Sequence, residues 1–145
     1  MIRLLRHDLW YHDAMTFEAR HIGVSIDCSP EKVYVFSANP QNLPRWATGL
    51  SGSVTIEGTK VIAESPMGEI VIQFAKQNTF GVLDHDVTLA DGQRFYNPMR
   101  VFRNGNGSEV TFTLYRLPGV TDEAFEKDAV TIEGDLKKLK AFLEK

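Results

Sequence analysis

The residues best suited to chemistry lie close together in the middle of the chain. Asp84, His85 and Asp86 are consecutive, and Arg100 follows on a later segment. A carboxylate or imidazole held in an apolar site can act as a general acid or base, and a guanidinium can bind an anion. We therefore take Asp84, His85 and Arg100 as candidate catalytic residues, whose roles depend on the sheet face that each occupies.

Other kinds of site lack their sequence signatures. The four histidines, His7, His12, His21 and His85, show no metal-ligand spacing. The chain carries no nucleophile elbow, no P-loop and no dinucleotide fingerprint. The sequence therefore predicts no metal and no cofactor, and it does not indicate covalent catalysis.

Composition and charge narrow the class of protein. The 145 residues are 43% hydrophobic and 24% charged, with a formal net charge of -3. No cluster of Lys and Arg suggests a phosphate-binding surface, and no apolar run reaches the roughly 20 residues needed to span a bilayer. The single cysteine, Cys28, cannot form an internal disulfide. These features predict a cytoplasmic globular protein that binds no nucleic acid and does not span a membrane.

The start of the chain differs from the rest. Residues 1–14 show neither strand alternation nor helix caps. We expect an N-terminal extension there and a single domain over residues 15–145. Two interpretations of the extension stay open: Met15 is the true start of the protein, or the extension is an arm that covers part of the domain or a partner.

The first elements of the domain are predicted by alternation and by helix caps. Apolar and polar residues alternate over residues 20–27, which is typical of a strand with one buried face. Ser29 and Pro30 have the types preferred at the N-cap and first turn of a helix, which should end near Ala38. A second short helix, capped by Asn39, should follow.

Residues 50–117 have the pattern of six strands joined by short turns. Pairs such as Asp91-Gly92 and Gly105-Asn106 favour the positive φ that tight hairpins require. No connection in this region is long enough to hold a crossover helix, so the strands should form an antiparallel meander.

The last predicted element is a long amphipathic helix over residues 121–145. Thr121 suits its N-cap, and acidic residues follow in the first turn. Its apolar face consists of Phe125, Ala129, Ile132, Leu136, Leu139, Phe142 and Leu143. Because burial of each large side chain contributes roughly 1.5–3 kcal/mol, the helix must dock on a wide apolar surface.

One stretch, IDCSPEKVYVFSANPQNLPRW, carries a resemblance to a known family. Ser29-Pro30, Val33, Phe36, Asn39-Pro40 and Trp46 match a pattern that follows the first strand in the START-like, polyketide cyclase and lipid-transport superfamily. The rest of residues 20–145 resembles an uncharacterised bacterial subgroup of it. The resemblance implies an α+β helix-grip fold, also known from birch-pollen allergens, in which a curved seven-stranded antiparallel sheet wraps around the C-terminal helix.

The resemblance also implies a cavity between sheet and helix. The superfamily includes lipid carriers, hormone receptors, cyclases and adaptor-like proteins, so it supplies no fixed catalytic motif. We expect a binding or carrier protein for a small hydrophobic or amphipathic molecule. The alternative is a cyclase, dehydratase or hydrolase that uses Asp84 or His85 as general acid or base. Apolar residues on the outer sheet face favour a homodimer.

Hairpin registers decide which residues face this cavity. If Asp91-Gly92 is a two-residue turn, Ala90 pairs with Gln93 and Asp84 lies opposite Met99, on the inner face. The candidate ligand-binding residues are then Trp46, Asp84, Asn97, Met99, Phe112, Phe125 and Ile132.

A second register stays open, because a bulge at Pro98 would shift the pairing. His85, Arg100 and Tyr96 would then point inward together. That set of side chains would suit an anionic or carbonyl-bearing ligand.

Overall fold

The computed structural model describes residues 16–145, and for residues 51–53 only the backbone. The predicted extension at residues 1–14 lies outside the described residues. In chain order the elements are β1 (Ala19–Ile26), α2 (Pro30–Ala38), η1 (Pro40–Asn42), α3 (Leu43–Trp46), β2 (Ser51–Glu57), β3 (Lys60–Ser65), β4 (Gly68–Phe74), β5 (His85–Thr88), β6 (Arg94–Asn97), β7 (Met99–Asn104), β8 (Gly107–Tyr115) and α4 (Asp122–Leu143).

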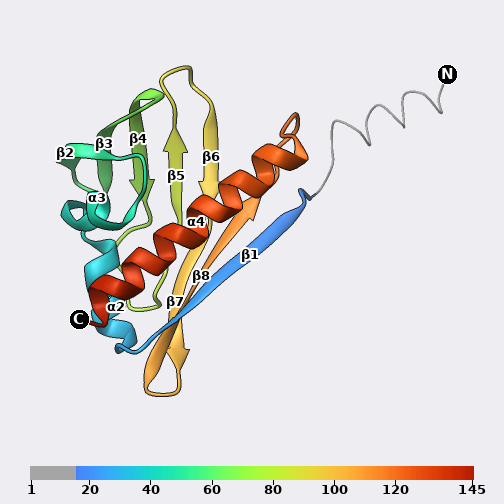
Figure 1. Ribbon diagram of the computed structural model, residues 1–145. Helices are drawn as coiled ribbons and strands as arrows, with labels where there is room; N and C mark the ends of the chain where they lie inside the picture. The colour runs from blue at the N-terminus through green and yellow to red at the C-terminus, as the bar shows by residue number, and fades with distance from the viewer. Residues whose placement is uncertain (1–15) are drawn as a thin grey trace.

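The strands form two antiparallel sheets that lie beneath α4 (Figure 1). One sheet has the order β1-β8-β7, and the other has the order β2-β3-β4-β5-β6. Every pairing is antiparallel, as the short connections predicted. The predicted α+β fold is confirmed.

The N-terminal helices begin at the predicted caps. The Ser29 hydroxyl accepts a hydrogen bond from the N–H of Lys32, and α2 ends at Ala38. The Asn39 side chain accepts a hydrogen bond from the N–H of Gln41 at 3.0 Å and begins η1. Both caps satisfy donors that the first helical turn would otherwise leave unpaired.

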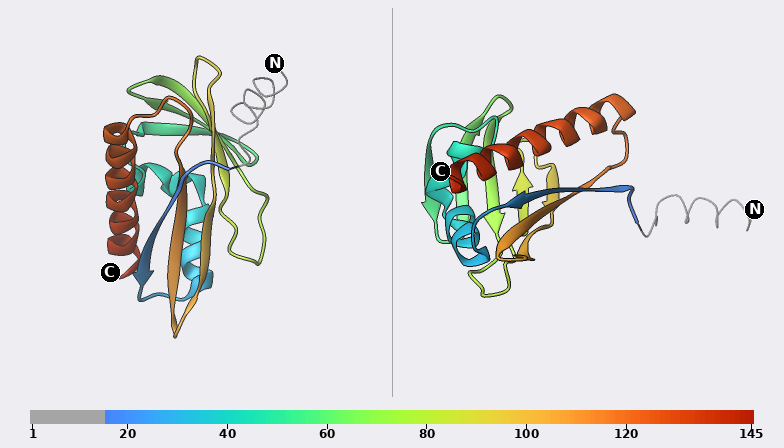
Figure 2. Two further views of the ribbon diagram at one scale, coloured as in Figure 1. Left: turned by 90° about the vertical axis from the view of Figure 1, so that its right-hand side faces the viewer. Right: turned by 60° about the horizontal axis from the view of Figure 1, so that its bottom comes forward.

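The C-terminal helix α4 crosses one face of the sheets (Figure 1). The Thr121 hydroxyl caps it by accepting a hydrogen bond from the N–H of Ala124 at 3.1 Å. Its buried residues are Phe125, Ala129, Leu136 and Leu139. Figure 2 shows α2 and α3 near the C-terminal half of α4, where the Phe36 and Phe142 rings stack at 5.9 Å.

Pro98 divides one predicted strand into β6 and β7. Proline has no N–H to donate to a ladder. The carbonyl of Pro98 accepts a hydrogen bond from the N–H of Thr113 at 2.9 Å. As a result β6 stays paired with β5, whereas β7 pairs with β8. The two sheets therefore part at Pro98, and a single bridge between Val82 and Arg100 links β7 to the segment before β5.

The hairpin between β5 and β6 has a three-residue loop. The N–H of Leu89 donates to the carbonyl of Gln93 at 2.9 Å, and His85 lies opposite Asn97. The predicted pairing of Ala90 with Gln93 is therefore wrong by one residue. Because side chains alternate along a strand, this shift turns β5 over.

The next hairpin is as predicted. A two-residue turn at Gly105 and Asn106 joins β7 to β8, and Met99 lies opposite Phe112. The buried residues alternate along each strand and are Met99 and Val101 in β7 and Ser108, Val110 and Phe112 in β8.

Candidate ligand-binding cavity

A cavity of about 310 Å³ lies between α4, α3 and the inner face of the sheets. Its apolar lining consists of Leu43, Trp46, Ala47, Leu50, Met67, Ile72, Phe74, Val87, Leu89, Phe95, Phe112, Leu114 and Ile132. Its polar lining consists of Thr48, His85, Asn97, Asp128, Thr131 and Asp135. A mainly apolar pocket with a few polar groups is typical of a small-molecule site.

The structure brings together part of the predicted set. Among the residues named from the sequence, those that line the cavity are Trp46, His85, Asn97, Phe112 and Ile132. Met99 lies instead in the core, with 1% of its surface exposed. Phe125 lines a smaller hollow of about 60 Å³ that shares Phe95, Asn97, Leu114 and Asp128 with the cavity.

Asp84 lies on the outer face of the sheet, which corrects the predicted inward placement. The reason is the three-residue loop after β5, because the one-residue shift in register exchanges the side chains that face inward and outward. The Asp84 carboxylate accepts hydrogen bonds from Nε and Nη2 of Arg100 at 2.8 and 2.7 Å, and from the N–H of Met99 at 2.9 Å. The Tyr96 hydroxyl donates a further bond at 3.0 Å.

This arrangement also decides against the alternative register. Of the residues that it placed inward, His85 faces the cavity, but Arg100 and Tyr96 lie outside with Asp84. The hydrogen bonds from Arg100 hold the pKa of the Asp84 carboxyl below its usual value, against an opposing effect of burial. The outer cluster is thus a satisfied ion pair, which stabilises the sheet and leaves no free acid or base.

His85 is held in a defined protonation state. Its Nδ1 lies 3.0 Å from the carbonyl oxygen of Leu83, which can only accept, so Nδ1 carries the proton. The imidazole packs between the rings of Phe74 and Phe112, with centroids 5.2 and 5.9 Å away. Burial lowers the pKa of His85, so the ring is neutral at pH 7 and Nε2 has a free lone pair. No residue of the range 16–145 hydrogen-bonds Nε2.

Two acidic residues on α4 complete the polar lining. The Asp135 carboxylate accepts hydrogen bonds from the N–H of Thr48, at 3.0 Å, and from the Thr48 hydroxyl. Burial raises the pKa of Asp135, although these bonds favour its ionised form. Burial also raises the pKa of Asp128. Neither acid was predicted from the sequence, although Asp128 and Asp135 lie four and three residues from Ile132, a spacing that places them beside the apolar stripe of α4.

Comparison with known proteins bears on the fold. No family model and no curated protein sequence matches the chain. A structure of an uncharacterized protein from Bacillus thuringiensis superposes with a TM-score of 0.70 at 18% identity, covering 87% of this chain and 98% of that one. Ara h 8.0201 superposes with a TM-score of 0.68 at 12% identity, covering 87% of this chain and 97% of that one. The chain therefore has the helix-grip fold that these structures share.

A third similar structure adds an assembly state. The Aha1 dimer from Colwellia psychrerythraea superposes with a TM-score of 0.67 at 19% identity, covering 88% of this chain and 96% of that one. At this level of identity the likeness concerns the helix-grip fold alone. The dimer is a property of that protein.

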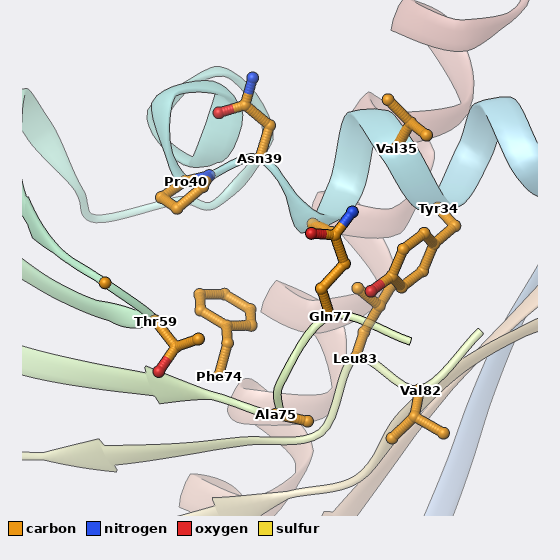
Figure 3. Close-up of a pocket in the computed structure, with 12 residues that line it drawn as sticks. Tyr34, Val35, Asn39, Pro40, Thr59, Phe74, Ala75, Gln77, Val82 and Leu83 are labelled. Carbon is orange, nitrogen blue, oxygen red and sulfur yellow. The ribbon is translucent and has the colours of Figure 1, made fainter. Parts of the chain in front are cut away.

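A second cavity of about 340 Å³ lies near the first in this helix-grip domain (Figure 3). It is bounded by α2, η1 and the segment that follows β4, and Tyr34 and Gln77 supply polar groups to its lining. The Tyr34 hydroxyl accepts a hydrogen bond from the N–H of Asn78 at 3.0 Å. Phe74 belongs to the lining of both cavities, so its ring lies where they approach each other.

Metal and membrane sites receive no support from the part of the chain that the structure describes. Residues 16–145 contain no group of three or more His, Cys, Asp or Glu side chains arranged to hold a metal ion. His7 and His12 lie outside these residues. None of the described helices combines the length and apolar character that a membrane crossing needs.

Proposed function

We propose that this helix-grip protein binds a small, largely apolar molecule in the cavity between the sheets and α4. The observation that carries the proposal is the cavity lining, where aromatic rings such as Trp46, Phe95 and Phe112 surround a few polar groups. Ligand pockets span roughly 300–1,000 Å³, and about 310 Å³ lies at the lower end of that range. A ligand the size of a bicyclic aromatic or a monoterpene fits this volume.

Filling the cavity tests the proposal. Ile132 forms part of the α4 wall, and Ile132→Trp places an indole in the space that the ligand would occupy. Val130 lies on the same helix with 59% of its surface exposed, so Val130→Trp is a matched control. Titration with naphthalene-based probes should give binding to the parent protein and to Val130→Trp, with at least tenfold weaker binding to Ile132→Trp. Equal affinity for all three proteins would count against the cavity as the site.

A second candidate is acid–base catalysis in the same cavity. It is favoured by the neutral His85, whose Nδ1–H is fixed by Leu83 and whose Nε2 is available to take a proton. On this hypothesis His85→Gln removes turnover but keeps ligand binding. Unchanged turnover of a converted substrate by His85→Gln would exclude His85 as the base.

Assembly and location stay predictions. The outer face carries the exposed aromatic residues Tyr96 and Phe102, which suit burial against a second copy. We therefore keep the homodimer as a prediction, to be tested by light scattering during size-exclusion chromatography with Phe102→Glu. Cytoplasmic location, predicted from composition, is tested by fractionation.

A further inference from the structure

The charged residues that line the cavity are all acidic. Among the described residues that line it there is no Lys or Arg, whereas Asp128 and Asp135 are both present. His85 is neutral and offers the lone pair of Nε2. A molecule bound in the cavity therefore meets two carboxylates and no positively charged side chain among the lining residues.

The two carboxylates have different surroundings. Asp135 is anchored by Thr48, whose hydroxyl also accepts a hydrogen bond from Nζ of Lys138 at 3.0 Å. Within residues 16–145, Asp128 accepts no hydrogen bond and forms no ion pair. Asp128 lies at the junction of the main cavity and the hollow beside Phe125. Asp128 is solvent-exposed, so its carboxylate lies at the open edge of the cavity and is free to bind a cation.

The neighbouring arginines already have other partners. Nη1 of Arg20 lies 2.6 Å from Glu126, and Nη1 of Arg116 lies 2.6 Å from Asp122. Both guanidinium groups also lie over the Phe125 ring. These contacts hold the arginines on other acids of α4, and leave Lys127, adjacent in sequence, as the cation that acts on Asp128.

We infer that the cavity selects a ligand with a protonated amine over one with a carboxylate, the amine lying at Asp128 and the apolar body among the aromatic rings. The inference rests on the proposed ligand-binding function and names its ligand class. A carboxylate in the same place would lie beside two acids, with no Lys or Arg among the described lining residues to receive it, and like charges repel. An amine would instead donate hydrogen bonds to a carboxylate that accepts none from residues 16–145.

A series of probes with one ring system tests the inference. Naphthylethylamine, naphthylethanol and naphthylacetate share the apolar body and differ in the head group. Binding by isothermal titration calorimetry at pH 7 and low salt should favour the amine over the carboxylate by at least about tenfold, and the preference should weaken with added salt. Asp128→Asn should remove most of it. Glu133→Gln, which changes the same charge in a surface pair with Lys137, is the matched control and should keep it.

The outcomes separate the inference from the function on which it rests. A carboxylate that binds as tightly as the amine, or an amine preference that survives in Asp128→Asn, overturns the inference and leaves the cavity as a binding site. Failure of all three probes to bind overturns both. Circular dichroism and thermal unfolding of Asp128→Asn show whether the variant is folded, and the alcohol should bind it as tightly as it binds the parent.

Discussion

Arg100 holds Asp84 by two parallel hydrogen bonds, from Nε at 2.8 Å and from Nη2 at 2.7 Å, on the outer face of the sheet. The Asp84 side chain is 14% exposed and that of Arg100 is 50% exposed. Paired geometry of this kind makes the contact stronger than an ordinary surface ion pair. The interaction joins the segment before β5 to β7, across the point where the two sheets part.

Removal of the Asp84 charge should therefore lower stability and leave ligand binding unchanged. Asp84→Asn weakens the bonds from Arg100 and Tyr96, and we expect the free energy of unfolding to fall by about 1–2 kcal/mol. Urea denaturation of both proteins measures the change. Asp91→Asn, on the exposed hairpin loop, is a control for a charge lost elsewhere on the surface. A change in probe affinity in Asp84→Asn would contradict the outward placement.

The same pair predicts the sign of a pH effect. Because the pKa of Asp84 is lowered in the folded protein, its stabilising contribution is complete above the unfolded value of about 3.9. The contribution is lost as the pH falls through the folded value. The stability difference between the parent and Asp84→Asn should thus be constant near neutral pH and shrink in acid, as measured by urea denaturation at a series of pH values.

His85 should resist protonation on acidification. Burial lowers its pKa, so the folded protein keeps the neutral ring at a pH where the unfolded chain, with a value near 6.5, already takes up a proton. Stability should then decrease as the pH falls from about 6.5 toward the folded value. Nitrogen NMR shifts of the ring should report protonated Nδ1 and unprotonated Nε2 at pH 7. A ring that titrates above 6.5, or with the other tautomer, would contradict the structure.

Gly81 should be the least replaceable glycine among those with positive φ. Its φ is +72°, and a Cβ added there would overlap the carbonyl oxygen of Val101. Gly58 has φ +65° with nothing within 4 Å of such a Cβ. Thermal and urea unfolding should therefore show a loss of about 1 kcal/mol for Gly58→Ala, from backbone strain alone, and about 3 kcal/mol or more for Gly81→Ala. Equal losses would mean that the contact with Val101 is relieved at no cost.

Phe74 should limit the length of the ligand. Its ring contributes to both cavities, so Phe74→Ala should join them and admit an anthracene-based probe that the parent protein excludes. The variant should also lose roughly 3 kcal/mol of stability, in the range for large-to-small changes of packed aromatic residues. Phe80→Ala is the control, because Phe80 is 82% exposed. Exclusion of the longer probe by Phe74→Ala would show that the cavities stay separate.

Local signals were sufficient for most of the fold. The Ser29 and Thr121 caps and the apolar stripe of α4 depend on neighbours a few residues apart, and each lies where the sequence predicted. Such features are decided by hydrogen bonds and periodicity within one element, which a single sequence contains. The predicted division into seven strands differs only at Pro98, where the missing N–H interrupts the ladder.

The candidate site was harder because it depends on one residue of loop length. A positive φ at Gly92 suits both a two-residue turn and the observed three-residue loop. The residue types of the turn therefore do not decide the register of β5 against β6. The apolar pattern of Leu83, Val87 and Leu89 did contain the answer, since it places Asp84 on the opposite face. The burial of these apolar residues, rather than the turn motif, predicts the inward position of His85.

The pairing of β1 with β8 has a consequence for how the protein is made. Ala19 lies opposite Tyr115 and Ile26 opposite Ser108. Because β8 is the strand that pairs with β1, β1 has no partner among the described strands until the last of them has been synthesised. At ribosomal rates the nascent strand waits on the order of 5–20 s for β8 to emerge. Such long-range closure also favours slow refolding, in the millisecond to second range. During synthesis, the apolar face of β1 is therefore a segment that chaperones would be expected to protect.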